Sequence, residues 1–566
     1  MSKKKMKNSF LLQGSILAVA GLLVRVIGLI YRVPLTNILG EKGMGCYGTA
    51  YDVYNILILL SSQSMPIAVS KLVSEKLGRN ENNNAHRIFK GALIYGLVIG
   101  VICGLIAFFG GEWLASTFYH APSAGRALKV LAPTLTIACI LGVFRGYMQG
   151  LGDMVPTAIS QIFEQIVNAF VSVFAAYELL NYGYSVSTML SESKAEANAI
   201  SYGAAGGTLG TCLGAATALL VLIIIYLKRK SDILADISKQ DKGALDSFSR
   251  ITKMIIFTIT PMLISTTIYN ISNLLDNPIF QNIMELKFGL KEDARLALWG
   301  VYSSQYRVLT TMPIAIASAL AAAIVPSMIR SYAAGDKLIV NNKIDSAIKF
   351  SMIIALPCGF GLSVLGGPIN KMLFPNLSND MIVYMMMFSV FTVTAFSLST
   401  ISNSILQGID KLNVPIKNSA ISLGIHLVIL PLLLVVFKLG IYAVVIGDFT
   451  FAMTVCVLNS YSIKNYTGYT QEIKNTFLKP IISSVIMSIC CYLVYLLFHK
   501  LIGSNTISTL IAICVAIAVY GIMENYIKGW EITFQNKEYF EQQMGCSIYD
   551  VLPDMTESRK INSTKR

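Results

Sequence analysis

Apolar stretches of about twenty residues recur along this chain from one end to the other. A helix of that length can cross the hydrocarbon core of a bilayer. Because backbone polar groups in a bilayer must be satisfied within the segment, the pattern predicts an all-α polytopic membrane protein. We predict fourteen spans, of which the eighth is long enough to be broken: 10–33, 47–71, 89–110, 128–149, 155–180, 203–227, 251–278, 296–328, 345–366, 382–406, 414–437, 440–462, 478–499 and 505–524.

Composition supports the membrane class. Charged residues make up only 13% of the chain, and the mean hydropathy is +0.62, whereas a soluble domain carries about 25% charged residues. The lysine-rich start precedes an apolar stretch too long for a signal peptide, so the first helix is expected to stay in the membrane. Most of the ten cysteines lie in apolar runs and are interpreted as packing residues. We expect no metal or cofactor, because the histidines show no ligand spacing: His86, His120, His426 and His499.

The charged residues of the loops predict the orientation. The chain has a net charge of +14, and its lysines and arginines concentrate on every second loop, on the side of the N-terminus. Basic residues collect in cytoplasmic loops, so both termini are expected in the cytoplasm and no nucleic-acid partner is expected. A missed or extra helix would invert all later loops, so this asymmetry also supports the count of fourteen.

An internal repeat predicts the domain organisation. SMPIA at 64–68 returns as TMPIA at 311–315, QGLGDMVP at 149–156 as QGIDKLNVP at 407–415, and GLIYRVPL at 28–35 as SNLLDNPI at 272–279. Matches in this order predict two parallel six-helix bundles, related by an axis along the membrane normal. The predicted domains are an N-terminal bundle at 1–227, a cytoplasmic linker at 228–250, a C-terminal bundle at 251–462, helices 13 and 14 at 463–524, and a cytoplasmic tail at 525–566.

Three arginines lie inside predicted spans: Arg25, Arg32 and Arg307. Arg25 is about 22 Å from the start of its span, and Arg32 follows two turns later on the same face. An arginine at the centre of a spanning helix costs about 2.5–3.5 kcal/mol on insertion scales, so each needs compensation. Arg25 could pair with a neighbouring helix, and Arg32 could anchor the helix at the interface. The alternative is a cationic cavity that binds phosphate through the planar guanidinium fork.

Acidic residues within the spans are fewer. Asp52 is a candidate charge partner of Arg25 or Arg32, or a gate, and Glu164 lies in the fifth span. Asp276 and Asp448 are candidates for binding a coupling cation, and helix capping or an interfacial position is the alternative. Na⁺ or the membrane potential would then be the driving force.

The motifs resemble those of a known family. The first span reads VRVIGLIYRVP, and the eighth reads YSSQYRVLTTMP and continues to Val325-Pro326-Ser327. With fourteen spans and a parallel repeat, the chain resembles the MOP exporter superfamily, in its polysaccharide-biosynthesis branch of SpoVB–MurJ (YtgP-type) lipid II flippases. The resemblance covers roughly residues 8–525.

The resemblance implies a transporter that moves an undecaprenyl-pyrophosphate-linked saccharide across the plasma membrane of a bacterium. Arg25 and Arg307 would then line a central cavity, with Arg32 as a weaker match. The second span departs from the family, because it has the neutral ILILLSSQ at 56–63. The resemblance also places the lipid tail against helices 13 and 14, and leaves cell-wall synthesis enzymes as candidate partners.

Other functions stay open at this point. A different lipid-linked polysaccharide or a sporulation-specific wall precursor would use the same cavity. A cation-coupled drug exporter of the same superfamily usually has twelve spans and acidic cavity residues. A membrane-embedded glycosyltransferase needs a catalytic acid or base and a sizeable loop, but the long connections near 181–202 and 228–250 offer only scattered charges. A non-transporting scaffold for wall or coat assembly would tolerate loss of the arginines.

Overall fold

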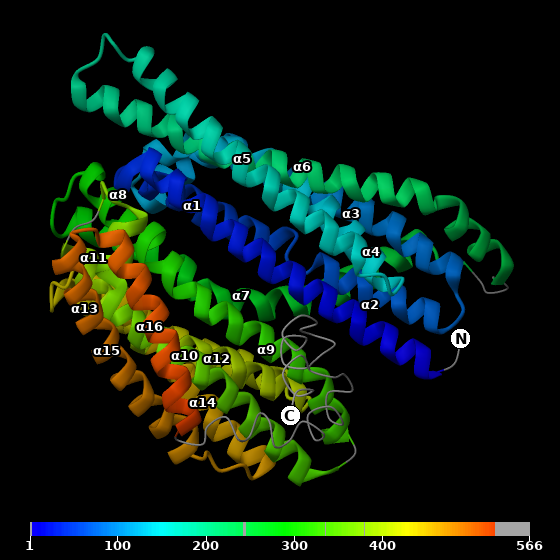
Figure 1. Ribbon diagram of the computed structural model, residues 1–566. Helices are drawn as coiled ribbons and strands as arrows, with labels where there is room; N and C mark the ends of the chain where they lie inside the picture. Colours follow the sequence, from blue (N-terminus) through cyan, green and yellow to red (C-terminus); the bar gives the residue numbers. More distant parts are fainter. Residues whose placement is uncertain (1–2, 241–244, 334, 378–379, 527–566) are drawn as a thin grey trace, which may run out of the picture. The chain divides into compact units, whose positions relative to one another are not determined.

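The computed structural model describes residues 3–240, 245–333, 335–377 and 380–526, and every regular element in these ranges is a helix. Eleven of the helical segments are long and apolar enough to cross a membrane, and one of them, Val19–Gly78, covers the first two predicted spans. The chain therefore has an all-helical polytopic membrane fold (Figure 1). The predicted tail at 525–566 lies almost entirely outside the described residues.

The first six predicted spans are helical, but the connections differ from the prediction. Residues 34–46, predicted as a loop, continue the first helix, which bends at Gly40 with a φ of 67°. The predicted connections at 181–202 and 228–250 are also largely helical, because α5 and α6 extend past the apolar stretches. The elements are α1 (Lys3–Ser61), α2 (Met65–Gly78), α3 (Asn82–Tyr119), η1 (Pro122–Ala124), α4 (Gly125–Gly150), α5 (Val155–Ser185) and α6 (Glu192–Gln240).

The other eight predicted spans are helical as well, and the eighth contains a π-helical segment within a continuous helix. A π-helical segment, Val301–Tyr306, separates a short helix from the helix that begins at Arg307. The elements are α7 (Phe248–Leu286), α8 (Glu292–Gly300), η2 (Val301–Tyr306), α9 (Arg307–Ala333), α10 (Lys337–Leu373), α11 (Asp380–Met387), α12 (Ser389–Gly408), α13 (Asn413–Val435), α14 (Tyr442–Thr467), η3 (Lys474–Leu478), α15 (Lys479–Ile502) and α16 (Asn505–Tyr526).

The chain forms two compact units that do not follow the predicted repeat boundary. Unit 1 comprises 1–312, 370–388 and 416–452, and unit 2 comprises 313–369, 389–415 and 453–566. The predicted six-plus-six arrangement and its linker stay predictions.

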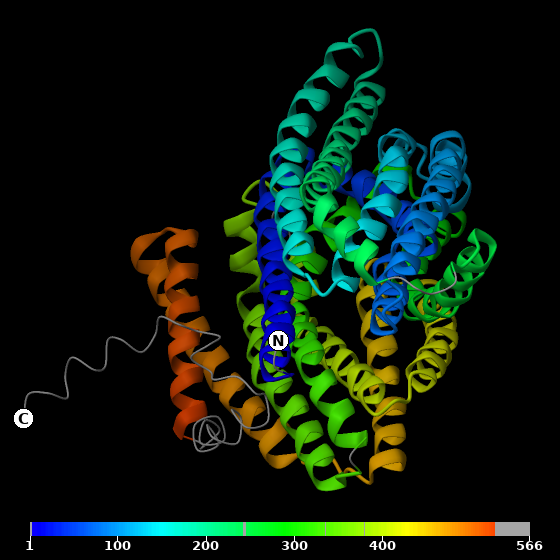
Figure 2. The same ribbon diagram turned by 90° about the vertical axis from the view of Figure 1, so that its right-hand side faces the viewer.

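Small residues allow the helices of unit 1 to approach closely. A Cβ on Gly206 would meet the carbonyl oxygen of Ala175 at 2.2 Å, and one on Gly210 would meet the Ser172 side chain at 2.1 Å. Close backbone approach at small residues is the usual way in which helices pack in a membrane. As a result α5 and α6 lie side by side, and their hairpin extends past the end of α1 near α8 in both views (Figures 1 and 2).

The segment before α7 is fixed to the α2–α3 turn by charge. The buried Asp246 carboxylate forms an ion pair with Lys76 at 2.6 Å, and the Asp246 N–H donates to Asn84 at 2.9 Å. Lys76 also bonds Glu81 at 2.7 Å, and this bond holds the pKa of the Glu81 carboxyl below its ordinary value. The end of the predicted linker is therefore an ordered contact.

Unit 2 has its own apolar cores. One core gathers α10 and α12, which approach so closely that the Ser389 hydroxyl donates to the carbonyl of Gly359 at 3.1 Å. Another joins α15 and α16 around Met487, Cys491 and Ala512. The side-by-side course of α15 and α16 is visible in Figure 2. These are the predicted helices 13 and 14.

Candidate functional site

Charged and polar side chains from several helices of unit 1 meet in its interior. They are far apart in the sequence, and nearly all are less than a tenth exposed. We call this set the Arg307 cluster: Asp52 on α1, Asp276 and Asn277 on α7, Tyr302 on η2, Arg307 on α9, His426 on α13 and Asp448 on α14.

Each carboxylate of the Arg307 cluster has a hydrogen-bond partner on another helix. Asn277 Nδ2 donates to Asp52 Oδ2 at 2.8 Å, and Tyr302 Oη donates to Asp448 Oδ2 at 2.6 Å. Asp276 Oδ1 lies 2.6 Å from His426 Nε2. Such bonds are required because a buried carboxylate without donors is expensive.

Arg307 supplies positive charge to this carboxylate cluster. Its guanidinium interacts electrostatically with Tyr302 and with the carboxylates of Asp52, Asp448 and Asp276. The side chain is half-buried. The carboxylates around Arg307 therefore favour its charged form inside the protein.

The π-helical segment before Arg307 positions both this residue and Tyr302. Buried aromatic rings support it: Trp299 lies against Tyr302 with centroids 4.9 Å apart, and Tyr302 stacks on Tyr306 at 6.0 Å. An inserted π turn changes which residues face the interior, and such turns are frequent at functional sites. Here the turn places the Tyr302 hydroxyl on Asp448 and directly precedes Arg307.

Arg32 lies in a different environment, among tyrosines. Its guanidinium interacts with Tyr31, Tyr47 and Tyr51, and the rings of the last two are 4.6 Å apart. The Tyr51 hydroxyl contacts the Thr211 hydroxyl on α6. The face that carries Arg32 is therefore aromatic and hydroxyl-rich. Arg25, two turns earlier, lies on the exposed side of α1.

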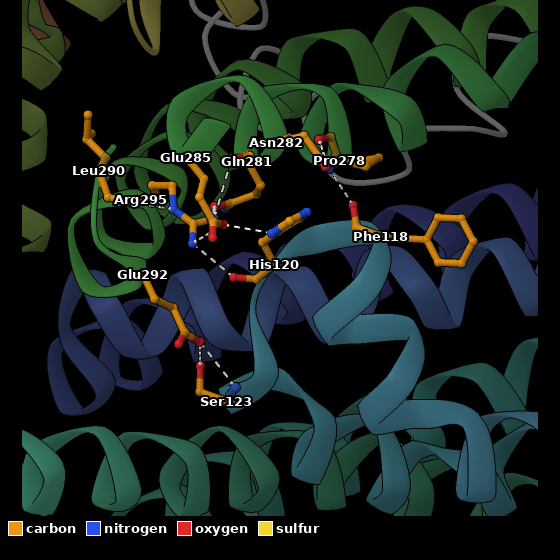
Figure 3. A network of polar contacts seen from close by, with 10 residues as sticks. All are labelled: Phe118, His120, Ser123, Pro278, Gln281, Asn282, Glu285, Leu290, Glu292 and Arg295. Carbon is orange, nitrogen blue, oxygen red and sulfur yellow. Dashed lines mark hydrogen bonds and ion pairs between the residues drawn. The ribbon is translucent and has the colours of Figure 1, made fainter. Parts of the chain in front are cut away.

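A second polar network joins the end of α3 to the α7–α8 turn (Figure 3). The buried Arg295 side chain pairs with Glu285 at 2.8 Å and donates to the His120 carbonyl at 3.0 Å. Glu292 accepts the Ser123 hydroxyl at 2.6 Å. We call these residues, with Gln281 and Asn282, the α3–α8 network.

An apolar cavity of about 520 Å³ lies between α1, α3 and α7. Val53, Leu57 and Leu275 line it, and two of them, Val53 and Leu275, are next in sequence to Asp52 and Asp276 of the Arg307 cluster. At its other side, Asn282 donates to the carbonyl of Phe118 at 2.7 Å. The cavity thus borders both polar networks.

The structure brings together some of the predicted residues and separates others. Arg307, Asp52, Asp276 and Asp448 share one cluster, although Asp52 was expected beside Arg25 or Arg32. The reason is tertiary, since α7 and η2 pack against α1. Within the described ranges, no group of three or more His, Cys, Asp and Glu side chains is arranged to hold a metal ion.

Several members of these networks were not predicted. His426 was set aside because the histidines lack a shared spacing, yet an ionisable residue within the eleventh span was itself a signal. Asn277 and Tyr302 carry no such signal, because an amide or phenol in a span is ordinary. Arg295 lies one residue before the predicted start of the eighth span, so it was taken for a loop charge.

A family model and two curated relatives match this chain. The model of a family described as "Polysaccharide biosynthesis protein" matches residues 11–332, more than half of the chain. The lipid II flippase MurJ of Bacillus subtilis (strain 168) is 24% identical over 565 residues, 95% of this chain and 97% of the relative. Stage V sporulation protein B of the same organism is 25% identical over 348 residues, 61% of this chain and 63% of the relative.

Solved structures share the fold. MurJ in an inward closed conformation aligns with a TM-score of 0.63 at 15% identity, covering 90% of this chain and 98% of that chain. An inward-facing multidrug resistance transporter of the MATE family, in the MOP superfamily, aligns with a TM-score of 0.62 at 14% identity, covering 80% and 98%. The expected polysaccharide-biosynthesis family is therefore confirmed, and this multi-pass membrane chain belongs to the polysaccharide biosynthesis protein family.

Proposed function

We propose that this protein is a flippase for an undecaprenyl-pyrophosphate-linked saccharide, with lipid II as its first candidate substrate. It moves the headgroup from the inner to the outer leaflet of the bacterial plasma membrane by alternating access around a cationic cavity. It acts as a transporter and not as an enzyme. The similarity to MurJ along 95% of the chain supports this proposal at the level of the whole protein.

The observation that carries the proposal is the position of Arg307. It is a half-buried arginine inside the predicted eighth span, directly after a π turn, and it interacts electrostatically with carboxylates from three other helices. A pyrophosphate offers the planar guanidinium a bidentate partner. We propose that Arg307 exchanges its carboxylate partners for the pyrophosphate during transport.

Arg25 and Arg32 complete the proposed pyrophosphate site from α1. Arg25 lies on the exposed side of the helix. Arg32, held among tyrosines, contributes as a gate or an anchor, and Asp52 serves as the charge that releases and recaptures Arg307. With the N-terminus in the cytoplasm, the α3–α8 network closes the outer end.

The substrate chemistry needs no nucleotide. The prenyl tail stays in hydrocarbon, while the charged headgroup requires a polar path. Moving negative charge outward is favoured by an inside-negative potential, at about 2.3 kcal/mol per charge per 100 mV. The membrane potential is thus a sufficient driving force in this scheme.

Complementation of a strain depleted of its lipid II flippase tests the proposal. The wild-type protein should restore growth, whereas Arg307→Ala and Arg25→Ala should not, at equal membrane levels. We expect more than a tenfold fall in precursor reaching the outer leaflet for Arg307→Ala, because a charge-assisted bond contributes about 1.5–3 kcal/mol. Arg79→Ala, which removes an exposed arginine paired with Glu75, is the matched control and should rescue.

Other outcomes select among the alternatives. Full rescue by both cavity variants would disprove the arginine mechanism. Failure of the wild type would favour another lipid-linked polysaccharide or a sporulation precursor, which the similarity to the stage V sporulation protein already suggests. Export of cationic drugs by the purified protein would support the multidrug alternative, whose fold is similar.

A further inference from the structure

His426 is held between two oxygen atoms in the interior of unit 1. Its Nδ1 lies 3.1 Å from the carbonyl oxygen of Gly447 on α14, and its Nε2 lies 2.6 Å from Asp276 Oδ1 on α7. The imidazole is 1% exposed, as is Asp276. The ring is fixed further by Phe451, whose ring lies edge-on at 6.0 Å.

These contacts determine how many protons the pair holds. A carbonyl oxygen only accepts, so Nδ1 must carry a proton. A contact of 2.6 Å between Nε2 and a carboxyl oxygen also requires a proton between the two atoms. The pair is therefore either an imidazolium with a carboxylate or a neutral imidazole with a carboxylic acid. In both forms it holds one more proton than a neutral histidine beside an ionised aspartate, and its net charge is zero.

Loss of that proton is incompatible with the observed contact. The Nε2 lone pair would then face a carboxylate oxygen at 2.6 Å, and the two would repel. Asp276 Oδ2 is buried without a hydrogen-bond partner among the described residues. An ionised Asp276 would thus lose its one strong donor, at a high cost in a dry site.

The charge of the pair matters because other charged groups lie around it. Asp448 on α14 interacts with His426 and accepts the Tyr302 hydroxyl from η2. Arg307 on α9 interacts with Asp276, and Asp52 on α1 with Arg307. On α7 the next residue, Asn277, is neutral and bonds Asp52.

We propose that the Asp276–His426 pair is a proton-binding site, and that its proton, shared between α7 and α13, is taken up together with the anionic headgroup. The proton joins the two helices in the described conformation, and its release separates them. This inference rests on the proposed function for its role in transport, but the proton site itself stands on the geometry of the pair.

Proton occupancy is linked to anion binding through Arg307. The loaded pair is neutral, whereas the unloaded pair carries one negative charge near the guanidinium. Arg307 is therefore more available to a pyrophosphate when the pair is loaded. Because such coupling is reciprocal, binding of the anionic headgroup favours uptake of the proton.

The proton site can be tested without transport. The chain has four histidines, so ¹⁵N-histidine labelling of the full protein in lipid nanodiscs resolves each ring by single substitution. We expect the His426 signals of the wild type to show the shared proton, and Asp276→Asn to return them to those of a neutral imidazole. Identical His426 signals in the wild type and in Asp276→Asn, from about pH 5 to about pH 9, would overturn the proposal.

The coupling is tested by binding of undecaprenyl pyrophosphate to the same nanodiscs in sodium-free buffer. For the wild type we expect affinity to fall as pH rises, with a slope approaching about one decade per pH unit, as one linked proton requires. Asp276→Asn with His426→Asn retains a bonded pair but no titratable proton, and should fold and bind with a flat profile. His86→Asn, at a buried histidine 3.3 Å from Tyr147, is the control and should keep the slope.

The outcomes separate the two proposals. A flat wild-type profile, or a dependence on added Na⁺ in its place, would overturn proton coupling while leaving the flippase proposal intact. A shared proton with no binding of the pyrophosphate lipid would confirm the site and contradict the flippase proposal. A slope that survives in the double variant would assign the proton to another group and so overturn this inference.

Discussion

Asp52 shows how a single carboxylate is kept inside a membrane-spanning region. It is 7% exposed, accepts a hydrogen bond from Asn277 and interacts with the charge of Arg307. The same amide also donates to the Thr49 hydroxyl at 3.1 Å, so it ties α7 to two successive turns of α1. Removing the Asn277 amide would leave the buried Asp52 carboxylate with fewer hydrogen-bond donors.

At this scale we predict that Asn277→Ala destabilises the protein by about 1–3 kcal/mol, the usual cost of leaving a buried group unsatisfied. The measurement is the thermal unfolding midpoint in detergent, compared with the exposed Asn342→Ala on α10. Equal midpoints for the two variants would show that the Asp52 contact contributes nothing to stability.

At the residue scale, the sequence marks those side chains whose burial inside a span is costly. Arg307, Asp52, Asp276 and Asp448 stand out because charges in apolar spans are rare. Their pairing was not predictable, since His426 and Asp276 are separated by 150 residues and meet only through the packing of α7 with α13. The assignment of Asp52 to Arg25 or Arg32 followed closeness in sequence, and tertiary structure replaced it with Arg307 and Asn277.

Among the elements, the contact of α1 with α8 depends on two glycines. A Cβ on Gly45 would meet the carbonyl oxygen of Leu296 at 1.9 Å, and one on Gly300 would meet that of Glu41 at 1.8 Å. Both obstacles are backbone atoms, which cannot rotate away. The two helices therefore touch main chain to main chain.

We predict that Gly45→Ala and Gly300→Ala each force α1 and α8 apart and lower the unfolding midpoint by several degrees, a change typical of overpacking by about 1–3 kcal/mol. Gly21→Ala, with nothing within 4 Å of the added methyl, is the control and should leave the midpoint unchanged. A midpoint for Gly300→Ala that matches this control would contradict the close contact.

Helix positions were predictable and helix ends were not. The predicted apolar stretches are largely helical in the described residues, but hydrophobicity does not report helical residues outside the apolar stretch. The polar extension of α6 to Gln240 and the helical passage through 34–46 were therefore missed. At Gly40 the positive φ of 67° is non-helical and forms a kink between two helices.

In the whole molecule, the α3–α8 network connects segments from the two predicted repeats. Arg295 alone contacts Glu285, Gln281, Leu290 and the carbonyl of His120. In the alternating-access proposal, the outer end of the cavity, where this network lies, must open. The bonds of the network must then break and re-form. The network is therefore expected to set how often that end opens.

We predict that Arg295→Ala increases hydrogen exchange several-fold in 118–124 and 281–295, because Glu285 and Gln281 lose their shared partner. Exchange in nanodiscs, followed by mass spectrometry, measures it. Lys129→Ala removes a surface pair with Glu112 near the same helices and should change little. Unchanged hydrogen exchange in Arg295→Ala would show that the α3–α8 network does not control opening of the outer end.

At the scale of the whole molecule, the predicted all-helical membrane fold is confirmed, and the predicted arrangement of two six-helix bundles stays a prediction. Mean hydropathy and span length are properties of the sequence, so the all-helical membrane fold followed directly. The repeat is a pattern of sequence and not of contact. Unit 1 joins α11, nearly all of α13 and the first part of α14 to the N-terminal helices. Such mixing depends on tertiary packing that no motif encodes.

The π-helical segment at Val301–Tyr306 stores one extra residue in the path between α8 and α9. Each residue of an α-helix turns the chain by about 100°, the angle implied by 3.6 residues per turn. If the wide turn migrates along the helix, the side chains it passes rotate by about that angle while both ends stay in place. Tyr302 would then leave Asp448 and Arg307 would face a new direction, so the cluster could change partners by a shift of register within one continuous helix.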